Sequence, residues 1–284
     1  MDHSPSEIAE DDRLRSEYMR HLLDRATFQQ PAASEAGVIP RVLVQFWDAP
    51  DGIPADVRAC MESWAPVETS GFTRLLFDDT SARQFIDERL DPRHLAAFDA
   101  CSHPAMRADY FRLCYVVRFG GVYVDADDEY QGADLEQFIR NDCLRVQALC
   151  YDIATGSMLD VVSAIGSGLG DGRIFYVNNN PLIAGPAHPV VADALERATQ
   201  GLTQRSHVER DIQSLTGPGN LTAALVQHAA VLDALGAASD FQVLTDWGDV
   251  AVSKWPLAYR EDGRNWRNWT RGEDIPQRDR TARA

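Results

Sequence analysis

Long apolar runs, paired cysteines and positive charge are all scarce in this sequence of 284 residues. No stretch approaches the roughly 18 to 20 consecutive apolar residues of a membrane-spanning helix, so we expect no integral membrane association. The five cysteines form no C-x-x-C pair and are odd in number, which favours buried reduced thiols over disulfides or a zinc cluster. The 27 Lys and Arg residues face 43 Asp and Glu residues, and this net charge of −16 excludes a general nucleic-acid binder, because phosphates would be repelled.

What is present suits a folded protein, since 45% of the residues are hydrophobic and 25% are charged. We expect one large domain with additions. An N-terminal helix and connector would occupy residues 1–36, the main domain residues 37–270, and a flexible tail residues 271–284. The first residues are acidic and lack the pattern of an export signal, so we expect a cytoplasmic protein.

The hydrophobic pattern alternates between strand and helix periods. Residues 42–47 are almost continuously apolar, as in a strand that is buried on both faces of a parallel sheet. A capping box at residues 4–7 and the helical spacing after it predict an N-terminal helix. The alternation predicts an α/β fold. The expected strands are 42–47, 72–77, 122–125, 144–150, 174–177, 241–244 and 249–252, and the expected helices are 54–64, 81–90, 104–119, 189–202 and 221–235.

Asp125-Ala126-Asp127 is the motif with the clearest chemical meaning. Thirty residues are aspartate, so about three such D-x-D tripeptides are expected by chance. This one follows an apolar strand, where extended backbone would direct both carboxylates to one side, at the strand end where α/β sheets bind ligands. Oxygen ligands favour Mg²⁺ or Mn²⁺, and a solvated acidic turn is the alternative.

Two other metal motifs fit less well. An EF-hand loop starting at Asp125 would place Tyr130 where glycine is needed, and it would follow a strand instead of a helix. A phosphatase of the haloacid dehalogenase type uses D-x-D near the start of its domain and a later lysine, whereas Lys254 is the only lysine here. We keep the phosphatase as a minor alternative.

The predicted helix 104–119 supplies two more polar side chains. Asp109 and Arg112 are three residues apart and share one helical face. Gly120-Gly121 ends the helix and turns the chain into the D-x-D strand. One site can therefore hold both side chains together with the two carboxylates.

The segment from Arg107 to Asp127, with the sequence RADYFRLCYVVRFGGVYVDAD, closely resembles the signature of glycosyltransferases with the sugar-binding D-x-D region, family 32. More distantly it resembles the clostridial glucosylating toxins and the yeast initiating mannosyltransferase. Weaker likeness extends over residues 39–270, at the opening strand, at Gly217-Pro218 and at Asn268-Trp269. Val44 departs from the family's usual histidine, and the histidine before the final tryptophan is missing.

The resemblance implies a GT-A fold in which a divalent cation, Mn²⁺ or Mg²⁺, joins the D-x-D to the diphosphate of a nucleotide sugar. By similarity, Asp125 and Asp127 are metal and donor ligands, and Asp109 and Arg112 hold donor hydroxyls; an ordinary surface ion pair is the alternative for the latter two. The residues expected to bind the donor are Gln45, Trp47, Tyr123, Asn179, Asn268 and Trp269. The alternative to donor binding is core packing for Trp47 and Tyr123, and a structural role in a turn for Asn179.

The implied reaction is sugar transfer with retention of the anomeric configuration, which needs no separate general base. UDP-sugars are the favoured donors and GDP-mannose the second. The acceptor is a glycan, a small metabolite or a protein, and the acidic surface favours a cationic one. A nucleotide-binding relative that has lost catalysis is the alternative from the binding class.

Overall fold

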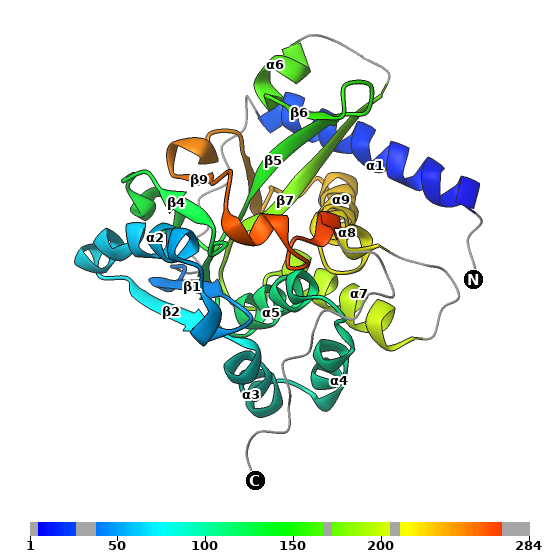
Figure 1. Ribbon diagram of the computed structural model, residues 1–284. Coiled ribbons are helices and arrows are strands. Elements are labelled where there is room, and N and C mark those ends of the chain that lie inside the picture. The colour runs from blue at the N-terminus through cyan, green and yellow to red at the C-terminus, as the bar shows by residue number, and fades with distance from the viewer. Residues whose placement is uncertain (1–4, 27–37, 167–171, 205–210, 269–284) are drawn as a thin grey trace.

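The computed structural model describes residues 5–26, 38–166, 172–204 and 211–268 (Figure 1). The strands are β1 (Val42–Phe46), β2 (Thr73–Phe77), β3 (Gly121–Tyr123), β4 (Asp128–Tyr130), β5 (Leu144–Asp152), β6 (Ser157–Leu159), β7 (Arg173–Ala184), β8 (Phe241–Leu244) and β9 (Ala251–Ser253). The α-helices are α1 (Pro5–Ala26), α2 (Ala55–Ser63), α3 (Asp79–Arg89), α4 (Pro92–Ala100), α5 (Pro104–Phe119), α6 (Val161–Gly166), α7 (Pro189–Thr203), α8 (Ile212–Leu215) and α9 (Pro218–Leu235). Among the described residues, no helix combines the length and apolar character needed to cross a bilayer.

A mixed sheet forms the centre of the molecule, and the predicted α/β class is confirmed. Its strand order is β2-β1-β3-β7-β5-β6. Strand β8 pairs in parallel with the first half of β5, residues 144–147. Strand β1 lies between two parallel neighbours, β2 and β3, as its continuous apolar sequence predicted. Strand β7 runs antiparallel to both β3 and β5.

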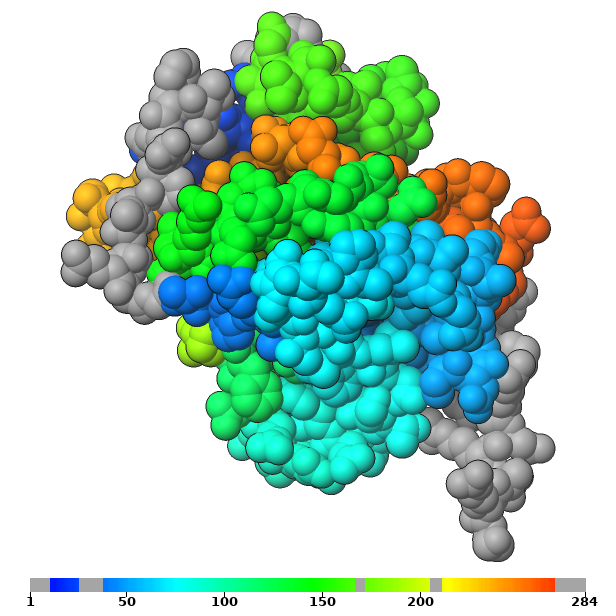
Figure 2. Space-filling model, turned by 90° about the vertical axis from the view of Figure 1, so that its left-hand side faces the viewer, coloured from blue at the N-terminus to red at the C-terminus, as the bar shows by residue number. Residues whose placement is uncertain are grey.

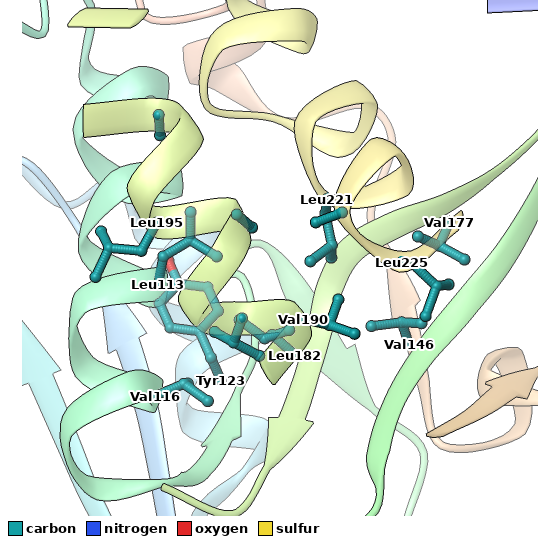
Figure 3. Packing of buried hydrophobic residues seen from close by; sticks show 14 of the residues in the cluster. Leu113, Val116, Tyr123, Val146, Val177, Leu182, Val190, Leu195, Leu221 and Leu225 are labelled. Atoms are coloured by element: carbon teal, nitrogen blue, oxygen red, sulfur yellow. The ribbon is translucent and has the colours of Figure 1, made fainter. Parts of the chain in front are cut away.

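The strands bury side chains on both faces of the sheet because their residues alternate between two hydrophobic clusters. Val44 of β1 and Tyr123 of β3 belong to the larger cluster, and their neighbours Leu43 and Val122 belong to the second. Figure 3 shows the larger cluster, in which Val190 and Leu195 of α7, Leu113 and Val116 of α5, and Leu221 and Leu225 of α9 pack beside the sheet.

The predicted N-terminal helix is present as α1, which crosses behind β5 and β7 in Figure 1. Met19 and Leu23 are fully or almost fully buried. The capping-box side chains, the connector 27–37 and the tail after residue 268 lie outside the described residues.

A small second sheet is formed by β4 and β9, which pair antiparallel. In Figure 2 orange residues of the β9 region lie against green residues that include β4. This pairing brings the C-terminal part of the chain to the segment that follows the D-x-D motif.

All five cysteines are buried and unpaired, as predicted from their number and spacing.

Candidate donor-binding pocket

The D-x-D motif lies in a turn that follows the end of strand β3. Strand β3 ends at Tyr123, and the backbone N–H of Asp128 donates to the carbonyl of Asp125 at 3.2 Å. The strand expected at 122–125 therefore ends two residues earlier, and the expectation of extended backbone across the motif was wrong, because Ala126 and Asp127 form a turn. The two carboxylates still face one pocket, because the turn, rather than strand alternation, directs them there.

The glycine pair after α5 fixes how the helix meets this turn. Gly120 has φ of 68°, and a Cβ there would lie 2.8 Å from the carbonyl oxygen of Ala184. A larger residue at position 120 would therefore be strained and would collide with backbone. The resulting turn sets Asp109 and Arg112 beside the D-x-D, and both line the pocket.

Arg112 connects the helix to the motif. Its Nη2 lies 2.8 Å from Asp125 Oδ1 and 3.0 Å from Asp109 Oδ1, and its Nη1 donates to the carbonyl of Asn179 at 2.8 Å. The guanidinium lies 4.4 Å from the ring centre of Tyr123 and is 3% exposed. Such a buried, multiply bonded guanidinium is rigid, so it fixes both carboxylates in place.

The asparagines Asn178–Asn180, which we expected just after a strand with a turn role as the alternative for Asn179, are part of β7. Asn179 Nδ2 donates to Asp109 Oδ1 at 2.8 Å. Asn180 accepts from the backbone N–H of Asp125 at 3.0 Å and donates to Asp128 Oδ2 at 2.8 Å, so its amide bridges the D-x-D turn. Sequence reasoning did not assign Asn180 or Asp128 to the site. The signals were the run of three asparagines at 178–180 and the third aspartate, Asp128, directly after the D-x-D.

Burial controls the charge of the carboxylates. It raises the pKa of Asp125 to about 6, against the lowering effect of Arg112, and Asp127 adds to the rise. Burial, then Asp125 and Asp127, raise the pKa of Asp128 to about 7. Burial also raises the pKa of Asp109. The floor of the pocket is therefore a region where additional positive charge is favourable.

The C-terminal segment 254–268 closes the other side of the pocket, and in Figure 1 its orange and red ribbon crosses in front of the sheet. Tyr259 donates its hydroxyl to Asp127 Oδ2 at 2.6 Å, and Arg260 forms an ion pair with the same oxygen. The segment starts at Lys254, whose backbone N–H donates to the carbonyl of Asp127 at 3.1 Å and whose Nζ lies 2.6 Å from Glu129. Tyr259 and Arg260 line the pocket, and neither was predicted for the site; the Arg- and Trp-rich composition of this region was the available signal.

The pocket has a volume of about 530 Å³, within the range of small-molecule pockets. Trp47, Tyr123 and Asn179 line it, as expected of donor-binding residues. Gln45 lies behind it, where its amide nitrogen is 3.4 Å from the carbonyl oxygen of Asp125. Asn268 donates to the carbonyl of Arg260 at 3.0 Å, so it shapes the C-terminal segment. Trp269 lies outside the described residues.

The side chains at the pocket supply only part of the ligand shell that a divalent cation needs. Within the part of the chain that the structure describes, no group of three or more acidic, His or Cys side chains could hold a metal ion. Mg²⁺ is commonly held by one or two carboxylates, with substrate phosphates completing its shell. Asp125 and Asp127, which supply carboxylate oxygens and line one pocket, fit that arrangement.

Comparison with known proteins gives the same family as the motif. Residues 54–142 match the family model described as glycosyltransferase sugar-binding region containing DXD motif. The predicted resemblance is thereby confirmed for this region, which contains Asp109, Arg112, Asp125 and Asp127.

Two curated proteins and one solved structure are similar to the chain. An uncharacterized glycosyltransferase of Acanthamoeba polyphaga mimivirus is 28% identical over 91 residues, 32% of this chain and 36% of that protein. Inositol phosphoceramide mannosyltransferase 2 of Schizosaccharomyces pombe is 31% identical over 94 residues, 32% of this chain and 26% of that protein. The matches thus span about a quarter to a third of these relatives. The structure of the PaToxG glycosyltransferase covers 90% of this chain and 94% of its own, with 15% identity and a TM-score of 0.47.

Proposed function

We propose that the protein is a metal-dependent glycosyltransferase that moves a sugar from a nucleoside-diphosphate sugar to an acceptor with retention of configuration. The observation that carries the proposal is that Asp125 and Asp127 line one pocket with Asp109, Arg112 and Asn179. Carboxylates at one end suit a cation and its diphosphate, and the fixed donors and acceptors beside them suit sugar hydroxyls.

Asp125 and Asp127 would hold Mn²⁺ or Mg²⁺ together with the diphosphate. The cation supplies charge stabilisation for the departing nucleoside diphosphate. Asp109 and Asn179 offer an acceptor and a donor for the sugar, and Arg112 keeps Asp109 and Asp125 in position. No general base is assigned, because in a retaining transfer the departing phosphate can take the acceptor's proton.

Trp47 is proposed to contact the nucleobase. It is 9% exposed and lines the pocket, and its buried indole N–H has no hydrogen-bond partner among the described residues. A buried donor without a partner is costly, so an acceptor on the ligand would satisfy it. Tyr259 lies edge-on to the Trp47 ring, with ring centres 5.2 Å apart, so the two aromatic side chains form one wall of the pocket.

UDP-sugars are proposed as donors first and GDP-mannose second; the name of the S. pombe relative gives a reason to test a mannose donor early. A glycan, small metabolite or protein would accept the sugar. Thermal denaturation with UDP, GDP, ADP and CMP, each with and without Mn²⁺, identifies the nucleotide, because a ligand that binds only the folded state stabilises it.

The decisive experiment follows nucleoside diphosphate released from a panel of nucleotide sugars with Mn²⁺. We expect Asp127→Asn to reduce release by about 100-fold or more, because it removes a charged ligand at the reacting diphosphate. Glu129→Gln is the matched control, since it removes one negative charge two residues away at a side chain paired with Lys254. We expect the control to retain release within about threefold.

Other outcomes separate the alternatives. Nucleotide binding without turnover in the wild-type protein would indicate a relative that has lost catalysis. Inorganic phosphate released from sugar phosphates would indicate a phosphohydrolase. Equal loss of release in both variants would contradict the proposed role of Asp127.

A further inference from the structure

Arg260 occupies the carboxylate that the proposed function assigns to the cation. Its Nη2 forms an ion pair with Asp127 Oδ2, the oxygen that also accepts from Tyr259 at 2.6 Å. The two side chains are 11% and 12% exposed. A cation bound at this oxygen would stand against a guanidinium at contact distance, so the two charges compete for Asp127.

Arg260 has a second anchor that does not depend on Asp127. Its guanidinium stacks on the Trp255 ring with 3.8 Å between the guanidinium carbon and the ring centre. Its carbonyl accepts from Asn265 Nδ2 at 2.8 Å and from Asn268 Nδ2 at 3.0 Å. The guanidinium would therefore remain at the pocket wall after leaving Asp127.

Arg260 also has a donor that nothing in the described residues satisfies. Its Nε is buried and without a hydrogen-bond partner there. A guanidinium carries five N–H donors in a planar fork that suits phosphate oxygens. A buried, unsatisfied donor of that fork, on a residue that lines the pocket, points to an anionic ligand with several oxygens.

We propose that Arg260 is a donor-positioning residue: it holds Asp127 in the free protein and moves to the diphosphate when a divalent cation takes its place on the carboxylate. This inference rests on the proposed function. The exchange keeps each charge paired in both states. In the free protein Arg260 balances Asp127, and in the complex the cation balances Asp127 while Arg260 balances part of the diphosphate.

The test measures two affinities that should change in opposite directions. Mn²⁺ binding to the nucleotide-free protein is measured by the electron paramagnetic resonance signal of free Mn²⁺. UDP binding at saturating Mn²⁺ is measured by calorimetry, with GDP instead if the thermal assay selects it. We expect Arg260→Gln to bind Mn²⁺ about tenfold more tightly, because its competitor is gone, and UDP about tenfold more weakly.

Two further variants control the result. Arg264→Gln removes the same charge from a pocket-lining arginine that pairs with Asp262 and not with Asp127, so its Mn²⁺ affinity should change by less than about twofold. Arg260→Lys keeps the charge but not the fork, so Mn²⁺ affinity should stay near wild type and UDP affinity should fall about threefold. This variant decides the question if Arg260→Gln does not fold.

A merely structural Arg260 would weaken both affinities in Arg260→Gln, and that result overturns the inference. Wild-type UDP affinity in both Arg260 variants overturns it as well. If the wild-type protein binds none of the nucleoside diphosphates with Mn²⁺, the proposed function itself fails.

Discussion

His94 is a buried histidine outside the pocket, where α4, α5 and α7 meet. Its Nδ1 lies 2.9 Å from the hydroxyl of Tyr110 and 3.1 Å from that of Thr199, and these hydroxyls lie 2.7 Å apart. Burial lowers the pKa of His94 below 6.5, and the positive charge of Arg93 adds to this, while Glu196 and Asp91 act in the opposite direction. The folded protein therefore keeps this imidazole neutral at pH values where the unfolded chain protonates it.

The stability contributed by neutral His94 should be fully present above pH 6.5 and be lost as the pH falls from 6.5 through the lower folded pKa. His94→Asn keeps a polar group near both hydroxyls but does not titrate. We expect the variant to be less stable by about 1–2 kcal/mol at neutral pH, and the gap to wild type to narrow at pH about 5. Urea denaturation at both pH values measures this gap, and a constant or wider gap would contradict the prediction.

Sequence periodicity correctly grouped some of the individual side chains that form the site, but it could not identify others. Asp109 and Arg112 are neighbours on one helix, so their spacing alone put them on one face. Asn180 and Arg260 reach the motif through tertiary contacts from 55 and 133 residues away. No local pattern encodes such contacts, so these residues could not be assigned from the sequence.

Helix α1 is held to the sheet by a side chain that completes the backbone pairing of β7. Ser16 Oγ accepts the backbone N–H of Phe175 at 2.9 Å and lies 3.3 Å from the carbonyl of Arg173. In the C-terminal half of α1, the Tyr18 hydroxyl donates to Asp233 of α9 at 2.6 Å, and Arg25 donates to the same carboxylate at 3.0 Å. Polar contacts therefore hold the helix to both β7 and α9.

Ser16→Ala should leave the buried N–H of Phe175 without this partner. We expect a loss of about 1–3 kcal/mol in the free energy of unfolding. Glu17→Ala on the exposed side of the same helix is the control, and its effect should stay within about 0.5 kcal/mol. Urea denaturation of both variants provides the comparison, and equal effects would show that Ser16 is not the anchor.

Most elements with a clear hydrophobic period were predictable, and several short or polar ones were not. The helix at 104–119 and the strand at 241–244 agree with prediction at both ends. Strand β7 was expected only over 174–177, because Asn178-Asn179-Asn180-Pro181 has poor strand propensity. Pairing with β5 and β3 overrides that propensity. The short strands β4 and β6 and the helices α4, α6 and α8 were missed.

For the whole molecule, the net charge of −16 is the dominant electrostatic property. Like charges repel most strongly in the compact state, and salt screens them over a Debye length of about 10 Å at 0.1 M. Surface ion pairs such as Arg83–Asp99 are weakened by the same screening, but each is worth only about 0–1 kcal/mol.

We therefore expect the thermal midpoint to rise between about 20 mM and 300 mM NaCl at neutral pH, because screening relieves the excess repulsion. A scanning thermal denaturation measures the midpoint, with sorbitol at equal osmolality as the uncharged control. A midpoint that falls with NaCl would mean that specific ion pairs outweigh the net charge.

At the molecular scale the α/β class followed from the alternation of periods, but the strand order did not. The order β2-β1-β3-β7-β5-β6 depends on pairing between strands far apart in the chain. The turn conformation of the D-x-D depends on it too, because Asn180 of β7 bonds to both sides of that turn.

Lys254 offers a single side-chain amine for chemical labelling. It is the only lysine, 42% of its side chain is exposed, and its neighbour Trp255 lines the pocket. Apart from the amino terminus, an amine-reactive dye would therefore attach one residue from the pocket-lining Trp255, where its emission can respond to ligand binding. Immobilisation through lysine would fix the chain next to a residue of the pocket wall, so a biosensor assay of this protein needs a different point of attachment.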